Sequence, residues 1–223
     1  MTDAHCHVTG GDPSVREFLI GRDFIGVHPW DAENCSDCSD CSIVRLRDRL
    51  LENPSLGVGE IGLDRLKQRE ISPRMREVFE TQLRLAFEFI RPVVLHGAKC
   101  WGQVVKTVFS FEHSNIPNFR TFPPLLFHGF SRSDGLIPDI VALNGFISVG
   151  PAVLNDHAVN YRELVKKIPI ERLLIETDRT AENAADCPSI RDVAAAVATY
   201  RNMSLAELER LTDENAERFL NLV

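Results

Sequence analysis

The chain has 223 residues, of which 44% are hydrophobic and 26% charged, and its formal net charge is -7. The apolar fraction excludes a mainly disordered chain, and the length predicts one domain over residues 1–223 with a sizeable core. The acidic balance argues against a large basic surface for duplex nucleic acid. An enzyme of this charge that acts on phosphates would need bound metal to supply positive charge.

The sequence has no apolar run near the roughly 20 residues that span a membrane, and no basic and apolar leader follows Met1. We therefore expect a cytoplasmic protein without a membrane partner. Free thiols are expected in that compartment.

Short apolar runs, each followed by a longer helical pattern, recur along the chain. They are rich in Val, Ile, Leu and Phe and almost continuously apolar, as strands buried on both faces are. The predicted strands cover residues 2–5, 24–28, 56–60, 92–96, 124–128, 145–149 and 172–177.

Helical periodicity fills the intervals between these runs. The strongest pattern covers residues 73–90, where Ser72 is a candidate N-cap and Pro73 suits the first turn. The other predicted helices cover residues 43–52, 101–109, 136–143, 159–168, 189–201 and 205–222, the last with a break near Thr212.

Strands that alternate with helices predict an α/β fold with a parallel sheet and right-handed crossovers. Residues 15–20 give an eighth strand if the helix before it is deleted, and eight strands close a (β/α)8 TIM barrel, here shortened near the second strand. The alternative is an open doubly wound sheet. That fold predicts a glycine-rich phosphate loop after the first strand, and the sequence has no such spacing.

Metal-type side chains stand where the predicted strands end. The carboxyl ends of all strands meet on one face of a parallel barrel, so side chains distant in sequence should converge there. One such residue alone is more often a hydrogen-bonded structural group, but a series at consecutive strand ends is hard to obtain by chance. The series is His5, His7, His28, Glu60, His96, His128 and Asp178, and it holds five of the seven histidines.

Imidazole and carboxylate groups together suit zinc, manganese or, less well, magnesium. The six residues His5, His7, Glu60, His96, His128 and Asp178 are too many for one tetrahedral ion. Two divalent ions that share a bridging carboxylate fit better, and two-metal sites are suited to hydrolysis.

The same residues carry a resemblance to a known family. The segments 3–7 (DAHCH), 26–29 (GVHP), 59–64 (GEIGLD), 82–86 (QLRLA), 92–96 (PVVLH), 128–131 (HGFS) and 173–178 (LLIETD) occur in the order found in the TatD family of metal-dependent deoxyribonucleases. The chain resembles this family over nearly its whole length, including a closing helix at 215–220.

The resemblance implies a barrel hydrolase that cleaves DNA phosphodiesters. By that analogy His5, His7, Glu60 and Asp178 hold one ion, and Glu60 bridges to a second ion held by His96 and His128. Glu60 and Asp178 are then the catalytic residues, and Asp178 also accepts a proton from the attacking water. His28 corresponds to a histidine at the rim of the site. It is expected to contact substrate, with packing under Pro29 and Trp30 as the alternative.

The sequence departs from the family pattern near the expected substrate. Ala98 and Lys99 stand where the family often has arginine, Arg132 follows Ser131 in place of a common glycine, and Arg179 follows Asp178. Lys99, Arg132 and Arg179 are candidate phosphate contacts, or ordinary surface charges.

These departures motivate a second hypothesis, a barrel hydrolase for an ester or amide bond such as that of an aminoacyl-tRNA-like substrate. A third is a metal-binding module without turnover. The complete ligand set argues against the third.

Three cysteines, Cys35, Cys38 and Cys41, follow the spacing C-x2-C-x2-C. Such a run can begin an iron–sulfur or zinc site, which needs a fourth ligand. The alternative is a tandem Cys-Ser-Asp expansion in a tolerant surface loop.

Overall fold

The computed structural model describes residues 1–35, 42–67, 69–111 and 122–220, and the statements below concern these residues. Its strands are β1 (Thr2–Cys6), β2 (Arg16–Leu19), β3 (Phe24–Ile25), β4 (Gly57–Asp64), β5 (Val93–Ala98), β6 (Leu125–Phe127), β7 (Gly145–Val149) and β8 (Leu173–Ile175). All recorded strand pairs are parallel.

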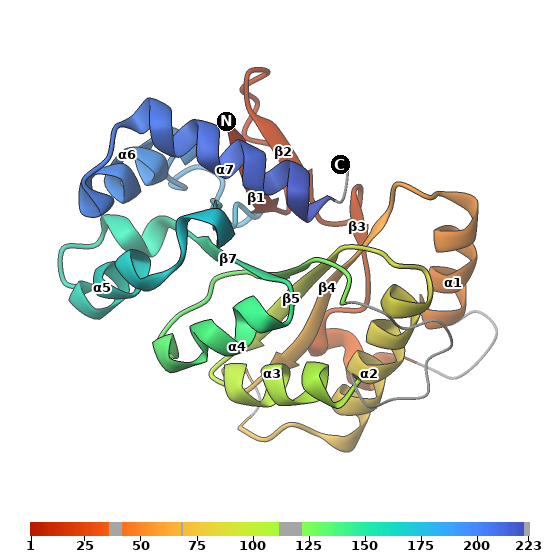
Figure 1. The fold of residues 1–223 in the computed structure, drawn as a ribbon. Coiled ribbons are helices and arrows are strands. Elements are labelled where there is room, and N and C mark those ends of the chain that lie inside the picture. The colour runs from red at the N-terminus through yellow and green to blue at the C-terminus, as the bar shows by residue number, and fades with distance from the viewer. Residues whose placement is uncertain (36–41, 68, 112–121, 221–223) are drawn as a thin grey trace.

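Helices follow most of the strands and lie outside them (Figure 1). The α-helices are α1 (Ser42–Glu52), α2 (Pro73–Glu88), α3 (Trp101–Ser110), α4 (Ile137–Ala142), α5 (Val159–Lys167), α6 (Ile190–Arg201) and α7 (Leu205–Phe219). Short 3-10 helices are η1 (Pro29–Asn34), η2 (Asp134–Leu136), η3 (Pro151–Leu154) and η4 (Ile170–Arg172). In the part of the chain that is described, every helix is too short or too polar to cross a bilayer.

The strands follow one another in chain order, which is the arrangement of a (β/α)8 barrel and not of a doubly wound sheet. Strands β3 to β8 form one ladder, and β1 and β2 form a separate pair. A single bridge from Ile20 to Phe24 joins the pair to β3. The predicted barrel fold is confirmed, with hydrogen-bonded ladders that are interrupted on either side of the β1–β2 pair.

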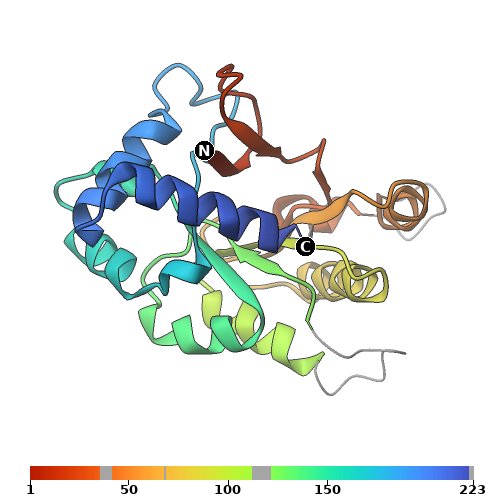
Figure 2. The ribbon, with the colours of Figure 1, turned by 45° about the horizontal axis from the view of Figure 1, so that its top comes forward.

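The shortening near the second strand is also confirmed. β2 follows β1 without a helix between them, and helix α7 packs against β1 instead. Figure 2 shows α7 as the long blue helix that runs across the molecule in front of the strands. The break predicted in this helix near Thr212 is wrong. The buried Thr212 hydroxyl donates to the carbonyl of Leu208 at 2.9 Å, so the helix accommodates the threonine without interruption.

An apolar layer lies beneath the strand ends. Val94 precedes His96 by two positions on β5, and Leu174 precedes Glu176 by two positions at β8, so each pair shares one face of its strand. Val94 and Leu174 belong to one buried cluster that Phe219 of α7 joins. The Phe219 ring lies 5.7 Å from Phe24 and 6.0 Å from Phe146. Apolar packing therefore supports the polar strand ends from below.

Side-chain and backbone hydrogen bonds join β1 to the segment after β8, where the ladder is interrupted. The buried carboxylate of Asp3 accepts hydrogen bonds from the backbone N–H of Thr177 at 3.0 Å and from its hydroxyl at 2.6 Å. The N–H of Asp178 donates to the carbonyl of His5, and the N–H of His7 donates to the carbonyl of Arg179. These contacts set the first strand beside the last one.

Replacing Thr177 by Val removes the hydroxyl and leaves the buried Asp3 carboxylate with one donor fewer. We expect the free energy of unfolding to fall by about 1–3 kcal/mol, the usual effect of breaking a buried hydrogen bond to a charged group. Denaturant unfolding measures the change. Thr177→Ser keeps the hydroxyl and should stay close to wild type, and equal losses in both variants would contradict the assigned role of this bond.

Candidate metal centre

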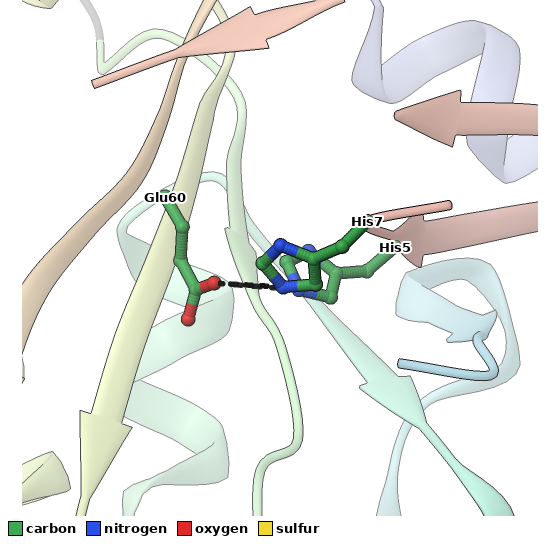
Figure 3. Close-up of side chains that lie close together, drawn as sticks. All are labelled: His5, His7 and Glu60. Carbon is green, nitrogen blue, oxygen red and sulfur yellow. Dashed lines mark ion pairs between the residues drawn. The ribbon is translucent and has the colours of Figure 1, made fainter. Parts of the chain in front are cut away.

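The Glu60 carboxylate lies at the centre of a cluster of imidazoles. Its Oε1 atom is 2.5 Å from His96 Nδ1, 2.6 Å from His128 Nε2 and 3.6 Å from His28 Nε2. Its Oε2 atom is 3.5 Å from Nε2 of both His5 and His7. Figure 3 shows the two β1-side imidazoles next to each other and directed at Glu60. Each carboxylate oxygen thus faces a different group of histidines.

Close approach of β4 to β5 places Glu60 beside His96. Gly62 pairs with His96 in the strand register, and its φ of 151° lies in a region that favours glycine. A Cβ atom there would lie 2.0 Å from the backbone oxygen of His96. A side chain at position 62 would therefore push the two strands apart.

Asp64, at the end of β4, orients His96 from the other side. Its Oδ2 accepts from His96 Nε2 at 2.9 Å, while Oδ1 accepts from the backbone N–H groups of Leu66 and Lys67 at 2.7 and 2.8 Å. Burial alone would raise the pKa of this carboxyl, but these donors hold it below its ordinary value. With the proton of neutral His96 on Nε2, the lone pair of Nδ1 is left facing Glu60.

Asp178 lies at the edge of the cluster. Its Oδ1 is 3.5 Å from His5 Nε2 and 3.7 Å from His7 Nε2, and its side chain is 49% exposed. Burial would raise its pKa, but contacts with His5 and the nearby charge of His128 lower it. Asp178 is therefore ionised at neutral pH and reaches both the histidines and solvent.

His28 is held by its backbone neighbour and by a glutamine of α2. Gln82 is buried and forms two hydrogen bonds with Val27, accepting from its N–H at 2.6 Å and donating to its carbonyl at 3.1 Å. The N–H of Trp30 donates to His28 Nδ1 at 3.2 Å. The free Nε2 of His28 faces Glu60, so the structure places His28 within the cluster and not only at its rim.

Glu176 supports the opposite side of the cluster. This buried carboxylate accepts from the N–H of Gly129 at 2.7 Å and from the hydroxyl of Ser148. One of its oxygens lies 3.7 Å from His128 Nδ1. It therefore ties the residue after His128 to β7 and the end of β8.

The cluster favours positive charge despite its burial. Burial lowers the pKa of an imidazole, yet contacts with Asp178 and Glu60 raise the pKa of His5 to about 9. Contacts with Glu60 and Glu176 likewise raise the pKa of His128, and contacts with Asp64 and Glu60 raise that of His96. His128, His28 and His5 hold the pKa of Glu60 well below its usual range, although burial opposes this.

The donor set also fits divalent cations. Both ring nitrogens of His5 and Nδ1 of His128 are buried without a hydrogen-bond partner in the described structure. Three sets of side chains each offer ligand atoms that lie within 4.8 Å of one another. The sets are His5, His7 and Glu60; His5, His128 and Asp178; and His28, Glu60 and His96. Nitrogen and carboxylate ligands at this spacing suit zinc or manganese.

A large cleft begins at Asp178 and runs outward between the loops after β6 and β7. Its volume is about 1100 Å³, and Arg132, Tyr161, Lys167 and Glu176 are among the residues that line it. Arg132 is exposed there, and Lys167 forms an ion pair with Asp134 at 2.5 Å. The cleft gives a substrate access to the cluster from this side.

The three basic residues predicted to contact phosphate lie in different environments. Arg132 lines the cleft, and Lys99 is exposed directly after β5. The guanidinium of Arg179 instead donates to the carbonyls of Ala184 at 2.7 Å and Cys187 at 3.2 Å. These bonds direct Arg179 into the following loop, so of the three only Arg132 borders the cleft among the described residues.

The possible cysteine site cannot be described from the structure. Cys35 is buried, whereas Cys38 and Cys41 lie outside the described residues. Cys6, Cys100 and Cys187 are free thiols.

The model of the family described as TatD related DNase matches residues 21–221, which is most of the chain. The chain belongs to the TatD family.

Two curated relatives have similar sequences. The metal-dependent hydrolase YabD of Bacillus subtilis is 28% identical over 205 residues, covering 89% of this chain and 76% of that protein. The 3'-5' ssDNA/RNA exonuclease TatD of Klebsiella pneumoniae is 27% identical over 209 residues, covering 88% and 76%. Together with the family match, they identify this chain as a metal-dependent hydrolase.

A solved structure confirms the TatD fold. The TatD homologue YJJV from Escherichia coli superposes with a TM-score of 0.79 at 23% identity, covering 99% of this chain and 98% of that one. The barrel architecture is thus shared, although the assigned ladder here is interrupted on either side of β1 and β2.

Several residues that shape the site are not among the strand-end histidines and acids. Gln82 and Glu176 lie in family-like motifs, but only their buried hydrogen bonds reveal what they position. The signal for Gln82 in the sequence was a polar residue among the apolar positions of α2, where a buried polar group needs hydrogen-bond partners. Asp64 closes the GEIGLD segment, and its bonds to the loop backbone and to His96 appear only in the structure.

Asp64→Asn should weaken metal binding by about 10- to 100-fold, because the residue that orients a metal-binding imidazole sets its tautomer and basicity. Asparagine has one acceptor oxygen, whereas Asp64 serves His96 and two backbone N–H groups with two. Competition with a chromophoric chelator measures the affinity. Asp139→Asn, at an exposed position of α4, is the control, and equal affinity in both variants would contradict this role.

Proposed function

We propose that the chain is one TatD-type hydrolase domain that cleaves phosphodiester bonds of DNA, preferentially in single strands. The observation that carries the proposal is the position of Glu60, which has one carboxylate oxygen near His96 and His128 and the other near His5 and His7. The nuclease named among the relatives supports a nucleic acid substrate. The net charge of -7 favours a single strand over a duplex, because a duplex has the higher charge density.

In this proposal six side chains hold two divalent ions. His5, His7 and Asp178 hold one, His96 and His128 hold the other, and Glu60 contacts both. His28 lies close enough to Glu60 to assist at the second position or to bind substrate phosphate. Bound divalent ions would supply the positive charge that a phosphodiester needs and would lower the pKa of a water molecule.

The protein groups have distinct tasks in the reaction. Asp178 is ionised, borders the cleft and lies beside the histidines, so it can accept a proton from the water that attacks phosphorus. Asp64 and Glu176 hold His96 and the segment after His128 in place. Arg132 lies where it can bind a phosphate along the cleft.

Cleavage of an end-labelled single-stranded oligonucleotide, with zinc, manganese or magnesium added in turn, tests the proposal. We expect Asp178→Asn to lower kcat by about 100-fold or more at saturating metal, the usual contribution of a proton acceptor. Asp186→Asn, an exposed acid in the same loop, should retain wild-type kcat.

A parallel panel of ester and amide substrates separates the competing reaction. Turnover of an ester or amide without any oligonucleotide cleavage would reject the nuclease proposal and favour the other hydrolase class. Full activity of Asp178→Asn on the oligonucleotide would reject the role given to Asp178.

A further inference from the structure

Trp30 is an exposed aromatic side chain beside the imidazole cluster, on the side where β3 and β4 end. It lies in η1, directly after His28 and Pro29, and is 44% exposed. Its ring centroid is 4.7 Å from that of His28 and 6.5 Å from that of His96. Single exposed apolar residues are common on protein surfaces, but this one lies beside the imidazole cluster.

The indole is held in a defined position. The backbone N–H of Trp30 donates to His28 Nδ1 at 3.2 Å, and the two rings meet edge to face at 77°. The Trp30 side chain is also among the groups that lower the pKa of Asp64. Trp30 is thereby linked to a residue facing Glu60 and to the carboxylate that orients His96. A rigid aromatic surface costs little conformational entropy when a ligand binds to it.

Lys67 covers the indole with a positive charge. Its Nζ lies 4.5 Å from the centroid of the Trp30 ring, which is within cation–π distance. The backbone of Lys67 is anchored by Asp64 Oδ1, whereas its side chain is exposed. Within the described ranges no ion pair between Lys67 and a carboxylate is recorded, so this ammonium group is available to an anion.

We propose that Trp30 is a stacking platform for an unpaired base next to the cleaved phosphodiester, and that Lys67 leaves the ring to contact a neighbouring phosphate. This rests on the proposed nuclease function and names the part of the substrate that the β3–β4 side of the site recognises. An aromatic ring with an adjacent cation is the usual combination in sites for single strands. In a duplex the faces of a base are covered by the stacked neighbouring bases, so the platform selects nucleotides outside a duplex.

The stacking is tested by combining one protein variant, Trp30→Ala, with one change in the substrate, the removal of bases. The substrates are a single-stranded oligonucleotide with normal bases and the same strand with an abasic analogue on each side of the cleaved bond. In wild type the abasic strand should lose between about five- and a hundred-fold in kcat/KM, the range expected for one stacked base. Trp30→Ala should lose a similar factor on the normal strand and almost nothing more on the abasic one.

Two results would overturn the platform. If Trp30→Ala reduces cleavage of both strands equally, Trp30 acts only by supporting His28 and Asp64. If the abasic penalty is as large in Trp30→Ala as in wild type, the base is recognised elsewhere. Trp30→Phe keeps an aromatic face and should retain most of the discrimination, which separates lost stacking from a misfolded site.

Equilibrium binding separates this inference from the nuclease proposal. Anisotropy of a labelled strand, measured without added metal, should show the same dependence on Trp30 and on the base. Binding with that dependence but without cleavage would leave the platform standing and reject the reaction.

Lys67→Gln should lower the slope of log affinity against log salt by about 0.7, the value for one phosphate contact on a single strand. Lys106→Gln, exposed on α3, should leave it unchanged, and equal slopes in the two variants would reject the phosphate contact.

Discussion

The site depends on a buried negative charge that must be matched by positive charge. Glu60 is 4% exposed, and five histidines approach its two oxygens to within 3.6 Å. A carboxylate in such a position is costly unless it is paired. Protons on His5, His96 and His128 meet part of this demand, since contacts with carboxylates raise the pKa of all three despite burial. Divalent ions meet it without protonating the ligands.

The barrel brings these histidines and acids together although it lacks one helix. One helix is missing between β1 and β2, yet α7 packs beside β1 and contributes Phe219 to the apolar layer. Asp3 and Thr177 connect the first strand to the end of the last one. His5 and Asp178, which come from opposite ends of the chain, are thereby brought within 3.5 Å. The same contacts therefore stabilise the junction between β1 and the segment after β8 and fix the geometry of the site.

Much of the fold and the principal polar cluster could be predicted from the sequence. Apolar runs that end in His or Glu recur with helical patterns between them, and parallel strands bring such ends to one face. The environment of individual side chains could not be predicted in this way. Arg179 was a candidate for phosphate, but its guanidinium bonds to carbonyls of its own loop. The partial exposure of Trp30 beside His28 likewise depends on how η1 is placed. Such features arise from loop conformation, which periodicity does not encode.

We propose that Glu60 joins two cation positions, and the metal content of the protein tests this most directly. Elemental analysis of the purified protein after exposure to zinc or manganese, with sulfur as the internal count of protein, should give about two divalent ions per chain. Glu60→Gln should lose most of both, and Glu70→Gln, at an exposed position, should keep both. Failure of wild type to bind either metal, or unchanged content in Glu60→Gln, would contradict the claim.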